Sequence, residues 1–266
     1  MTLYDAIGHD YAQTRKSDPR ISATLLEILK ASSPSTLVDI GAGTGSYARV
    51  LAEQGYRVLA VEPSATMRNQ ATAHPLVQWF DGFAESLPLP NQSADAAIVM
   101  LAFHHFQNPQ QALKEAHRVT NGGQIVLLTY DPDYISRFWL TRYFPAFVAD
   151  VQATFLPIAE LTDRLERVTN TNVAVMPFLL PFDLVDSFAA VGWARPELYL
   201  ESQVRNGISL FAKFDQAEIA DGLARLQRDL ESGVWDQEYG YLRQQQQYDA
   251  GYRFIYSTRQ QAARAI

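Results

Sequence analysis

The sequence predicts an α/β protein, a Rossmann-like, mostly parallel seven-stranded sheet with helices on both faces and a helical lid. Between Thr36 and Tyr130, short runs rich in Val, Ile and Leu alternate with helical segments. Near-continuous apolar strands separated by helices are typical of a parallel sheet covered on both faces. A glycine-rich turn also follows the first apolar run, as at the first strand-to-helix connection of such sheets.

The first half of the chain supplies five predicted strands, at Leu37–Ile40, Arg57–Val61, Val77–Phe80, Ala96–Leu101 and Gln124–Thr129. The intervening helices have ordinary ends. Gly55 follows the helical segment 46–54, where a C-terminal glycine belongs. Asn108 and Pro109 provide a cap and a first-turn proline for the next helix. Asn121–Gly123 is predicted as the turn before the fifth strand.

The pattern changes after Asp131. Residues 133–169 are rich in aromatic side chains and Leu, which favours two or three amphipathic helices. A sixth strand is predicted at Val173–Pro177 and a last one at Tyr252–Ser257. The residues between them, 183–247, have a mostly helical pattern, and Gln244–Gln247 is predicted as a solvated helix face or a loop.

These patterns predict three segments. Residues 1–131 form an N-terminal helix and a Rossmann-like ligand-binding core. Residues 132–250 form a helical lid and insertions, with the sixth strand near 173–177. Residues 251–266 contain the last strand, which completes the core sheet.

Composition narrows the classes of partner. The chain has 266 residues, a net charge of -7 and no cysteine. An acidic chain without a basic run is a poor binder of nucleic acid, whose phosphates attract Lys and Arg. The absence of cysteine excludes disulfides and thiolate metal sites. The chain shows neither a signal-peptide pattern nor an apolar stretch of membrane-spanning length, so we expect a cytoplasmic protein without a membrane partner.

The most specific motif is the segment Asp39–Gly45, which reads DIGAGTG. Its glycines let the backbone turn sharply and approach a ligand closely. The spacing is G-x-G-x-G, and a dinucleotide site would show G-x-G-x-x-G. Asp39 would be unfavourable beside a pyrophosphate, and it suits a ligand with a cationic amino group. The alternative is a plain strand-to-helix turn.

Two further segments lie at the same predicted sheet edge. Glu62 ends the second strand, 17 residues after Gly45, and a carboxylate there can accept two hydrogen bonds from a ribose diol. The alternative is a strand-end acid exposed to water. The loop Asp81–Pro88 follows the third strand, and the backbone of Phe83 and Ala84 is placed to meet an adenine edge.

Together these blocks resemble the class I S-adenosylmethionine (SAM)-dependent methyltransferases, in the small-molecule branch that includes ubiquinone- and trans-aconitate-type enzymes. The resemblance covers residues 36–131 strongly and the segment with Tyr4, Asp5, Tyr11 and Arg15 more weakly. The whole-chain pattern is also similar to methyltransferases of bacterial antibiotic-type pathways.

The resemblance implies SAM as cofactor, S-adenosylhomocysteine as product and a role for each matching position. The methionine part would lie against Asp39, Gly41, Ala42, Gly43 and Gly45, and the ribose against Glu62, with Pro63 beside it. Met67 would pack on the adenine, Phe83 and Ala84 would border it, and Leu101 would lie near the methionine part. Many relatives carry an Asp at the position of Phe83, so here stacking or other groups would hold the adenine. Tyr11 and Arg15 would close over the cofactor, unless they belong to a mobile N-terminal helix.

The resemblance also places His104 and His105 near the transferred methyl group. A histidine there is a candidate general base, because its pKa lies near neutrality; the alternative is a backbone-bonded or capping role. Adjacent residues on a strand face opposite sides, and the other histidines are scattered, so no metal site is expected. Tyr130 and Asp131 are candidate substrate contacts or a simple strand end. Trp139 and Tyr143 are candidates for the substrate cavity or, more commonly, core.

The function that follows is methyl transfer from SAM to an O, N or C nucleophile of a small-molecule metabolite, such as a secondary-metabolite intermediate. Three alternatives remain at this point. The same site serves a cyclisation or rearrangement, or the protein is a non-catalytic SAM binder, or it is a nucleotide-dependent oxidoreductase, which the glycine spacing disfavours. The aromatic-rich helical segment also leaves a homodimer open.

Overall fold

The structure is a computed structural model that describes residues 15–120 and 122–258. Its centre is a seven-stranded sheet of order β3-β2-β1-β4-β5-β9-β6. The strands are β1 (Thr36–Ile40), β2 (Arg57–Val61), β3 (Val77–Phe80), β4 (Ala96–Met100), β5 (Gln124–Tyr130), β6 (Val173–Pro177) and β9 (Tyr252–Ser257). Strands β1 to β5 pair in parallel, and β9 pairs antiparallel with both β5 and β6. The predicted mostly parallel sheet is confirmed.

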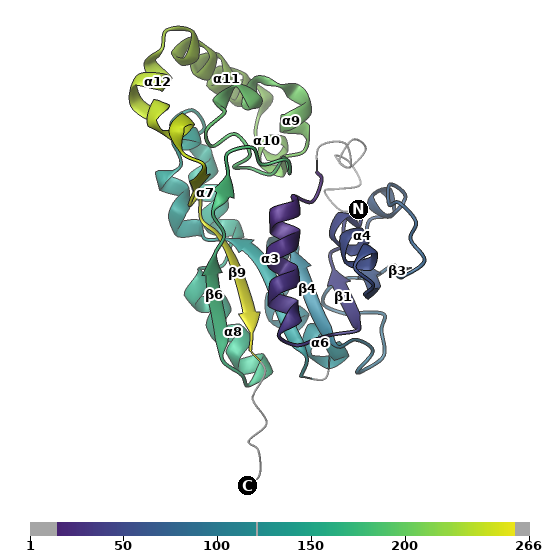
Figure 1. The fold of residues 1–266 in the computed structure, drawn as a ribbon. Coiled ribbons are helices and arrows are strands. Elements are labelled where there is room, and N and C mark those ends of the chain that lie inside the picture. Colours follow the sequence, from purple (N-terminus) through teal and green to yellow (C-terminus); the bar gives the residue numbers. More distant parts are fainter. Residues whose placement is uncertain (1–14, 121, 259–266) are drawn as a thin grey trace.

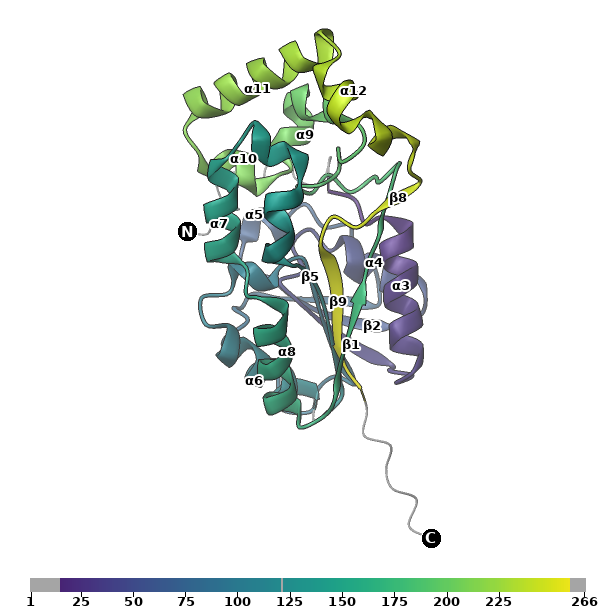
Figure 2. The same ribbon diagram turned by 90° about the vertical axis from the view of Figure 1, so that its left-hand side faces the viewer.

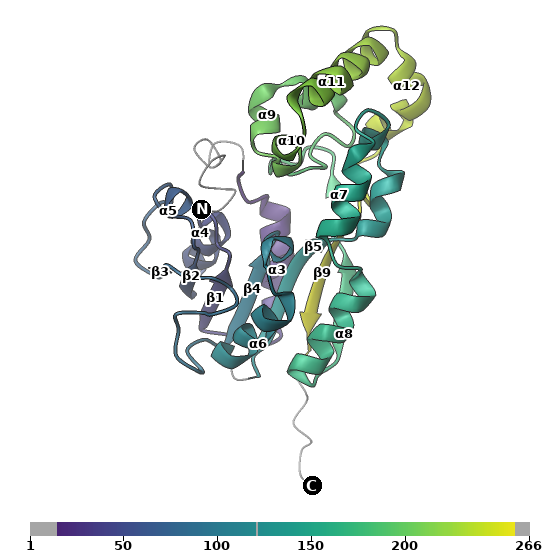
Figure 3. The same cartoon turned by 180° about the vertical axis from the view of Figure 1, so that it is seen from behind.

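Helices cover both faces of this sheet (Figure 1, Figure 3). On one face lie α3 (Pro19–Lys30) and α4 (Ser46–Glu53), and on the other lie α6 (Pro109–Thr120) and α8 (Ile158–Thr169). Strand side chains alternate between the two cores, as the pleat requires. In β2, for example, Val58 packs with α3 and α4, whereas Leu59 packs with α6 and α8.

The predicted strands agree with the observed ones to within one residue, and the β2, β3, β6 and β9 bounds are those expected. A small second sheet was not predicted. It pairs β7 (Leu180–Pro181) with β8 (Gln247–Tyr248). Two-residue strands give no periodic signal in a sequence, and the two lie far apart in the chain, so only the tertiary fold brings them together.

The lid lies beyond the carboxyl ends of the parallel strands (Figure 1, Figure 2). It consists of α7 (Ala146–Thr154), α9 (Ser202–Asn206), α10 (Ser209–Lys213), α11 (Gln216–Glu231) and α12 (Val234–Tyr239), with the short 3-10 helices η3 (Pro132–Arg137), η4 (Trp139–Arg142), η5 (Pro196–Leu200) and η6 (Gly240–Gln244). Its buried aromatic side chains are continuous with the core under α3 and α4. None of the helices in the described ranges is long and apolar enough to cross a membrane.

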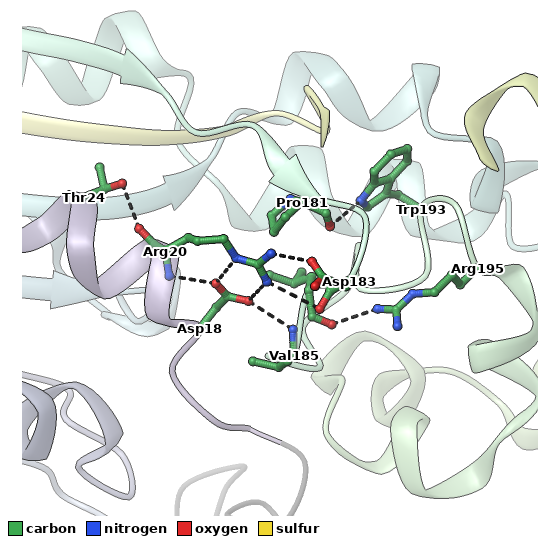
Figure 4. Close-up of polar contacts among 9 residues, drawn as sticks. Asp18, Arg20, Thr24, Pro181, Asp183, Val185, Trp193 and Arg195 are labelled. Carbon is green, nitrogen blue, oxygen red and sulfur yellow. Dashed lines mark hydrogen bonds and ion pairs between the residues drawn. The ribbon is translucent and has the colours of Figure 1, made fainter. Parts of the chain in front are cut away.

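A buried carboxylate joins the lid segment to the sheet domain (Figure 4). The Asp18 side chain is fully buried. It caps α3 by accepting from the backbone N–H of Arg20 at 2.9 Å, and it accepts from the Val185 N–H at 3.2 Å. The Arg20 guanidinium donates to the same carboxylate and also pairs with Asp183. Burial alone would raise the pKa of Asp18, but these hydrogen bonds outweigh it and the pKa is lowered.

We expect Asp18→Asn to lower the free energy of unfolding by about 2 kcal/mol, because a buried charge-assisted network loses its anion. The exposed partner of the same arginine supplies a control, since Asp183→Asn should leave the free energy of unfolding nearly unchanged. Urea unfolding of both variants measures the difference. Equal effects of the two substitutions would contradict the role given to Asp18.

Candidate functional site

The glycine loop lies at the point where the strand order reverses. Strand β1 is flanked by β2 and β4, and ligands of open α/β sheets bind outside the carboxyl ends of strands at such a position. The backbone N–H groups of Gly41 and Ala42 donate to the Val61 carbonyl, at 2.9 and 3.1 Å. The end of β1 is therefore held against the end of β2, and the loop after β4 lies on its other side.

Two glycines of this loop leave no room for a side chain. Gly41 has φ +73°, and a Cβ there would lie 2.8 Å from the Ala102 Cβ. Gly45 has φ +76°, and a Cβ there would lie 2.6 Å from the Trp79 ring. Because L side chains rarely adopt this backbone conformation, glycine is required at both positions for the loop to turn into α4.

Glu62 orders the loop from the neighbouring strand. Its side chain is buried, with 7% of its surface exposed. Oε2 accepts from the Gly43 N–H at 3.0 Å, and Oε1 accepts from the Ser64 N–H at 2.9 Å. Each carboxylate oxygen can accept more than one hydrogen bond, so shaping the loop does not by itself prevent this side chain from accepting further hydrogen bonds.

Asp39 lies buried beneath the same loop, on β1. Its Oδ2 is a buried atom without a hydrogen-bond partner among the described residues. Burial, and then the nearby charge of Glu62, raise the pKa of Asp39 to about 7. A buried acceptor of this kind is costly unless a ligand completes it, and a cationic group would lower the pKa again.

The structure also describes the other predicted cofactor positions that follow β2, β3 and β4. Met67 is buried in the short helix α5 (Ala65–Arg68), next to the loop at Gly43, and Pro63 directly follows Glu62. Ala84 is buried, whereas the Phe83 side chain is 55% exposed and its backbone bridges to Ser86. Leu101 has φ +54°, a conformation uncommon for a residue with a side chain. Such strain is found at ligand sites more often than elsewhere.

A cavity of about 90 Å³ lies between the sheet edge and the lid. Leu101, His104, Tyr130 and Tyr252 line it from the sheet side. Most of the remaining wall is apolar and comes from the lid, from Ile135, Phe138, Leu140, Phe147, Val151, Phe155, Phe188, Ile208 and Leu210. Leu101 therefore belongs both to the cavity wall and to the loop beside the glycine turn.

The two histidines differ in position. They lie in the 3-10 helix η2 (Phe103–His105), with ring centroids 3.9 Å apart, so the opposite-facing strand arrangement expected for them is wrong. Only His104 lines the cavity, where its ring stacks on Phe155 at 4.2 Å. Burial lowers the pKa of His104 well below its usual value, and burial together with Lys213 and Arg15 lowers the pKa of His105 to about 4. Both imidazoles are therefore neutral at neutral pH.

Several predicted substrate contacts do not reach the cavity. Asp131 caps η3 by accepting from the Asp133 N–H at 3.2 Å. The Trp139 indole donates to the Trp193 carbonyl at 2.8 Å within the aromatic core, and the Tyr143 hydroxyl donates to Asp229. None of the three lines the cavity, because each is occupied by a structural contact. Tyr130 does line it.

At the N-terminal end, Tyr11 lies outside the described residues. Arg15 lines the cavity and also a larger groove beside Gly45. Its guanidinium forms an ion pair with the buried carboxylate of Asp186. The sequence predicts a cofactor carboxylate as the partner of Arg15. The structure shows an ion pair with the carboxylate of Asp186, which no sequence pattern indicates.

Sequence reasoning missed most of the cavity wall. These wall residues belong to no motif and come from segments distant from one another in the chain: Phe155, Phe188, Tyr252, and the pair Ile208, just before α10, and Leu210, within it. The ion pair between Lys213 and Asp150, at 2.9 Å, also lines the cavity. No group of His, Asp and Glu side chains in residues 15–120 and 122–258 is arranged to hold a metal ion.

The chain is similar to known methyltransferases in sequence and in structure. Residues 38–128 match the methyltransferase domain family. A crystal structure of a candidate methyltransferase from an antibiotic biosynthesis pathway of Anabaena variabilis shares 47% sequence identity with a TM-score of 0.88, over 92% of this chain and 99% of that one. A ubiquinone/menaquinone biosynthesis C-methyltransferase of Rubrivivax gelatinosus is 34% identical over 42% of this chain. An uncharacterized methyltransferase of Anoxybacillus flavithermus is 31% identical over 53% of it. The chain spans 44% and 66% of the lengths of these two curated relatives.

Proposed function

The chain belongs to the class I SAM-dependent methyltransferases, and on that premise we propose that it transfers a methyl group from SAM to a small-molecule metabolite held under the lid. One observation carries the proposal. The Asp39 carboxylate, whose Oδ2 has no partner among the described residues, and the Glu62 carboxylate lie together at the glycine loop, and the apolar cavity adjoins that loop through Leu101.

The residues present fit SAM. The ammonium group of its methionine part suits Asp39, whose buried Oδ2 needs a partner. The ribose diol suits the remaining acceptor capacity of Glu62. The adenine suits a site between Met67 and the backbone of Phe83 and Ala84, although the exposed Phe83 ring has no carboxylate with which to bind the amino group. When bound, SAM supplies a methyl group that is already activated by the sulfonium.

The chain's own residues then bind, orient and exclude water. The lid covers the cavity with apolar side chains, and a dry site favours a reaction in which charge on sulfur disappears. Positioning of the nucleophile supplies most of the acceleration for an activated donor. Of the two histidines, we assign His104 the contact with the substrate, because it lines the cavity and stays neutral.

The first experiment is calorimetric titration of the protein with SAM, S-adenosylhomocysteine and NAD. We expect micromolar binding of the first two and none of NAD. If neither SAM nor S-adenosylhomocysteine binds, the proposed function is wrong. Methylated product with stoichiometric S-adenosylhomocysteine would then separate methyl transfer from a cyclisation, a rearrangement or simple binding.

The substrate is a small molecule in this proposal, and the relative of similar length from an antibiotic biosynthesis pathway makes a secondary-metabolite intermediate the first class to test.

A further inference from the structure

The lid cavity has a mostly apolar wall, and two of its lining residues carry a buried polar atom without a hydrogen-bond partner among the described residues. Nδ1 of His104 and Oη of Tyr130 are buried atoms that have no hydrogen-bond partner among the described residues. Both side chains line the cavity. Their rings contact the same neighbour, Phe155, with centroid distances of 4.2 and 5.6 Å. Two unpartnered polar groups therefore lie around one aromatic ring of the cavity wall.

These two atoms are complementary to a hydroxyl group. Burial raises the pKa of Tyr130, so its phenol stays protonated and can donate. A neutral imidazole carries one nitrogen that accepts and one that donates, and the depressed pKa of His104 keeps it in this form. A hydroxyl group accepts from one partner and donates to another, so a ligand hydroxyl is chemically complementary to the Tyr130 donor and to the His104 acceptor.

The charges of the cavity argue for a ligand without net charge. Three described lining residues are charged, and each is already in an ion pair. Lys213 on α10 pairs with Asp150 on α7 at 2.9 Å, and both line the wall. Arg15 pairs with Asp186, which is buried behind it. A carboxylate or ammonium group on the substrate would have to break one of these pairs or remain buried without a partner, which is costly.

The rest of the wall selects for an apolar body. Leu101, Ile135, Phe138, Phe147 and Leu210 are among the residues that enclose it. A cavity needs about 10–15 Å³ of such space for one water, so about 90 Å³ accommodates several water-sized groups. This is the scale of a compact ring.

We propose that the substrate is an uncharged, compact apolar ring compound with a hydroxyl group, phenolic or enolic, which Tyr130 and His104 bind by hydrogen bonds. This inference rests on the proposed function for its meaning as a substrate site, but it concerns binding in the cavity alone. It extends the proposal by naming the class of molecule and the polar group that is recognised.

Four matched probes test it: 4-ethylphenol, its methyl ether 4-ethylanisole, the anion 4-ethylbenzoate and the cation 4-ethylbenzylammonium. Dissociation constants are measured by ligand-observed NMR, with and without S-adenosylhomocysteine. We expect the phenol to bind at least about tenfold more tightly than either charged probe, because a buried unpaired charge costs more than one hydrogen bond. The ether should bind more weakly than the phenol because it cannot donate.

Variants assign the contact. Tyr130→Phe keeps the ring and should weaken the binding of 4-ethylphenol about three- to tenfold, which is the effect of losing one neutral hydrogen bond. It should also raise the melting temperature of the ligand-free protein slightly, because a buried unpartnered hydroxyl is removed. His104→Phe keeps an aromatic ring on Phe155 and should weaken the phenol similarly. Tyr256→Phe, a matched change on β9 outside the cavity wall, should leave the affinity unchanged.

Charged probes that bind as tightly as the phenol, no binding of any probe, or an unchanged phenol affinity in Tyr130→Phe would each overturn the inference. A different experiment tests the proposed function, because its failure would appear in the calorimetric titration with SAM and S-adenosylhomocysteine.

Discussion

Replacing Glu62 by alanine is expected to weaken SAM binding about a hundredfold to a thousandfold. The carboxylate accepts from the Gly43 and Ser64 N–H groups, and we assign its remaining capacity to the ribose diol. Two charge-assisted hydrogen bonds contribute about 1.5–3 kcal/mol each, and the lower part of their sum, about 3–4 kcal/mol, corresponds to this loss in affinity. Calorimetry with SAM and with S-adenosylhomocysteine measures it.

A matched control separates the site from general surface charge. Glu53→Ala removes a half-exposed carboxylate from α4, where it pairs weakly with Arg49 at 3.6 Å, and SAM affinity should be unchanged. Glu62→Gln keeps one acceptor oxygen and should fall between wild type and Glu62→Ala. A Glu62→Ala protein that is folded by circular dichroism and binds SAM normally would show that the ribose assignment is wrong.

The second large effect has opposite signs for stability and for binding. Asp39→Asn is expected to stabilise the ligand-free protein and to weaken its binding of SAM. Burial raises the pKa of Asp39 from 3.8 to about 7. Because the pKa of Asp39 is raised in the folded protein, this residue contributes its full stability below about pH 4, where it is protonated, and the contribution is lost as the pH rises through about 7. Above that pH the folded protein holds an unfavourable buried anion.

The asparagine variant has no such anion. A pKa shift of about three units corresponds to a maximum gain of about 4 kcal/mol in the free energy of unfolding. Because the site relaxes partly, we expect Asp39→Asn to gain about 1–3 kcal/mol at pH 8. Thermal unfolding at pH 8 measures the gain. The exposed carboxylate of Asp163 on α8, paired with Arg167, provides the control, because Asp163→Asn should leave both stability and binding nearly unchanged.

The wild-type affinity for SAM should depend on pH in the same window. A ligand ammonium group binds the ionised form of Asp39, so affinity should rise about tenfold between pH 6 and pH 7.5 as the carboxylate loses its proton. Asp39→Asn should remove this dependence and bind SAM about a hundredfold more weakly. If the pH dependence persists in the variant, a different group holds the ammonium.

A gain in stability with a loss in binding is the general behaviour of sites that keep a polar group ready for a ligand. Tyr130 has the same property in the cavity, where its unpartnered hydroxyl is buried. By contrast, Asp18 has several hydrogen-bond partners and serves stability. Asp39 and Tyr130, each with a buried polar atom that lacks a partner among the described residues, therefore lie at the two proposed ligand positions.

Much of the fold was determined by local patterns in the sequence. The apolar runs at β1 to β5 are long enough and regular enough to be recognised one at a time, because a strand buried on both faces needs nearly continuous Val, Ile and Leu. The glycine loop could be recognised because positive φ and close approach of neighbours permit few other residues, as at Gly41 and Gly45. Glu62 follows from its register with that loop, and chain order alone brings these residues to one edge.

Only the tertiary structure decided which side chains line the lid cavity. Tyr130 and Asp131 are adjacent, yet one lines the cavity and the other caps η3. Trp139 is core and Phe138 is cavity wall. The lid residues of α7 and α10 meet Tyr252 of the last strand through contacts between segments far apart in the chain. Burial of an aromatic residue looks the same in a sequence whether it faces a neighbour or a ligand, so the physical difference appears only when the surrounding elements have been packed.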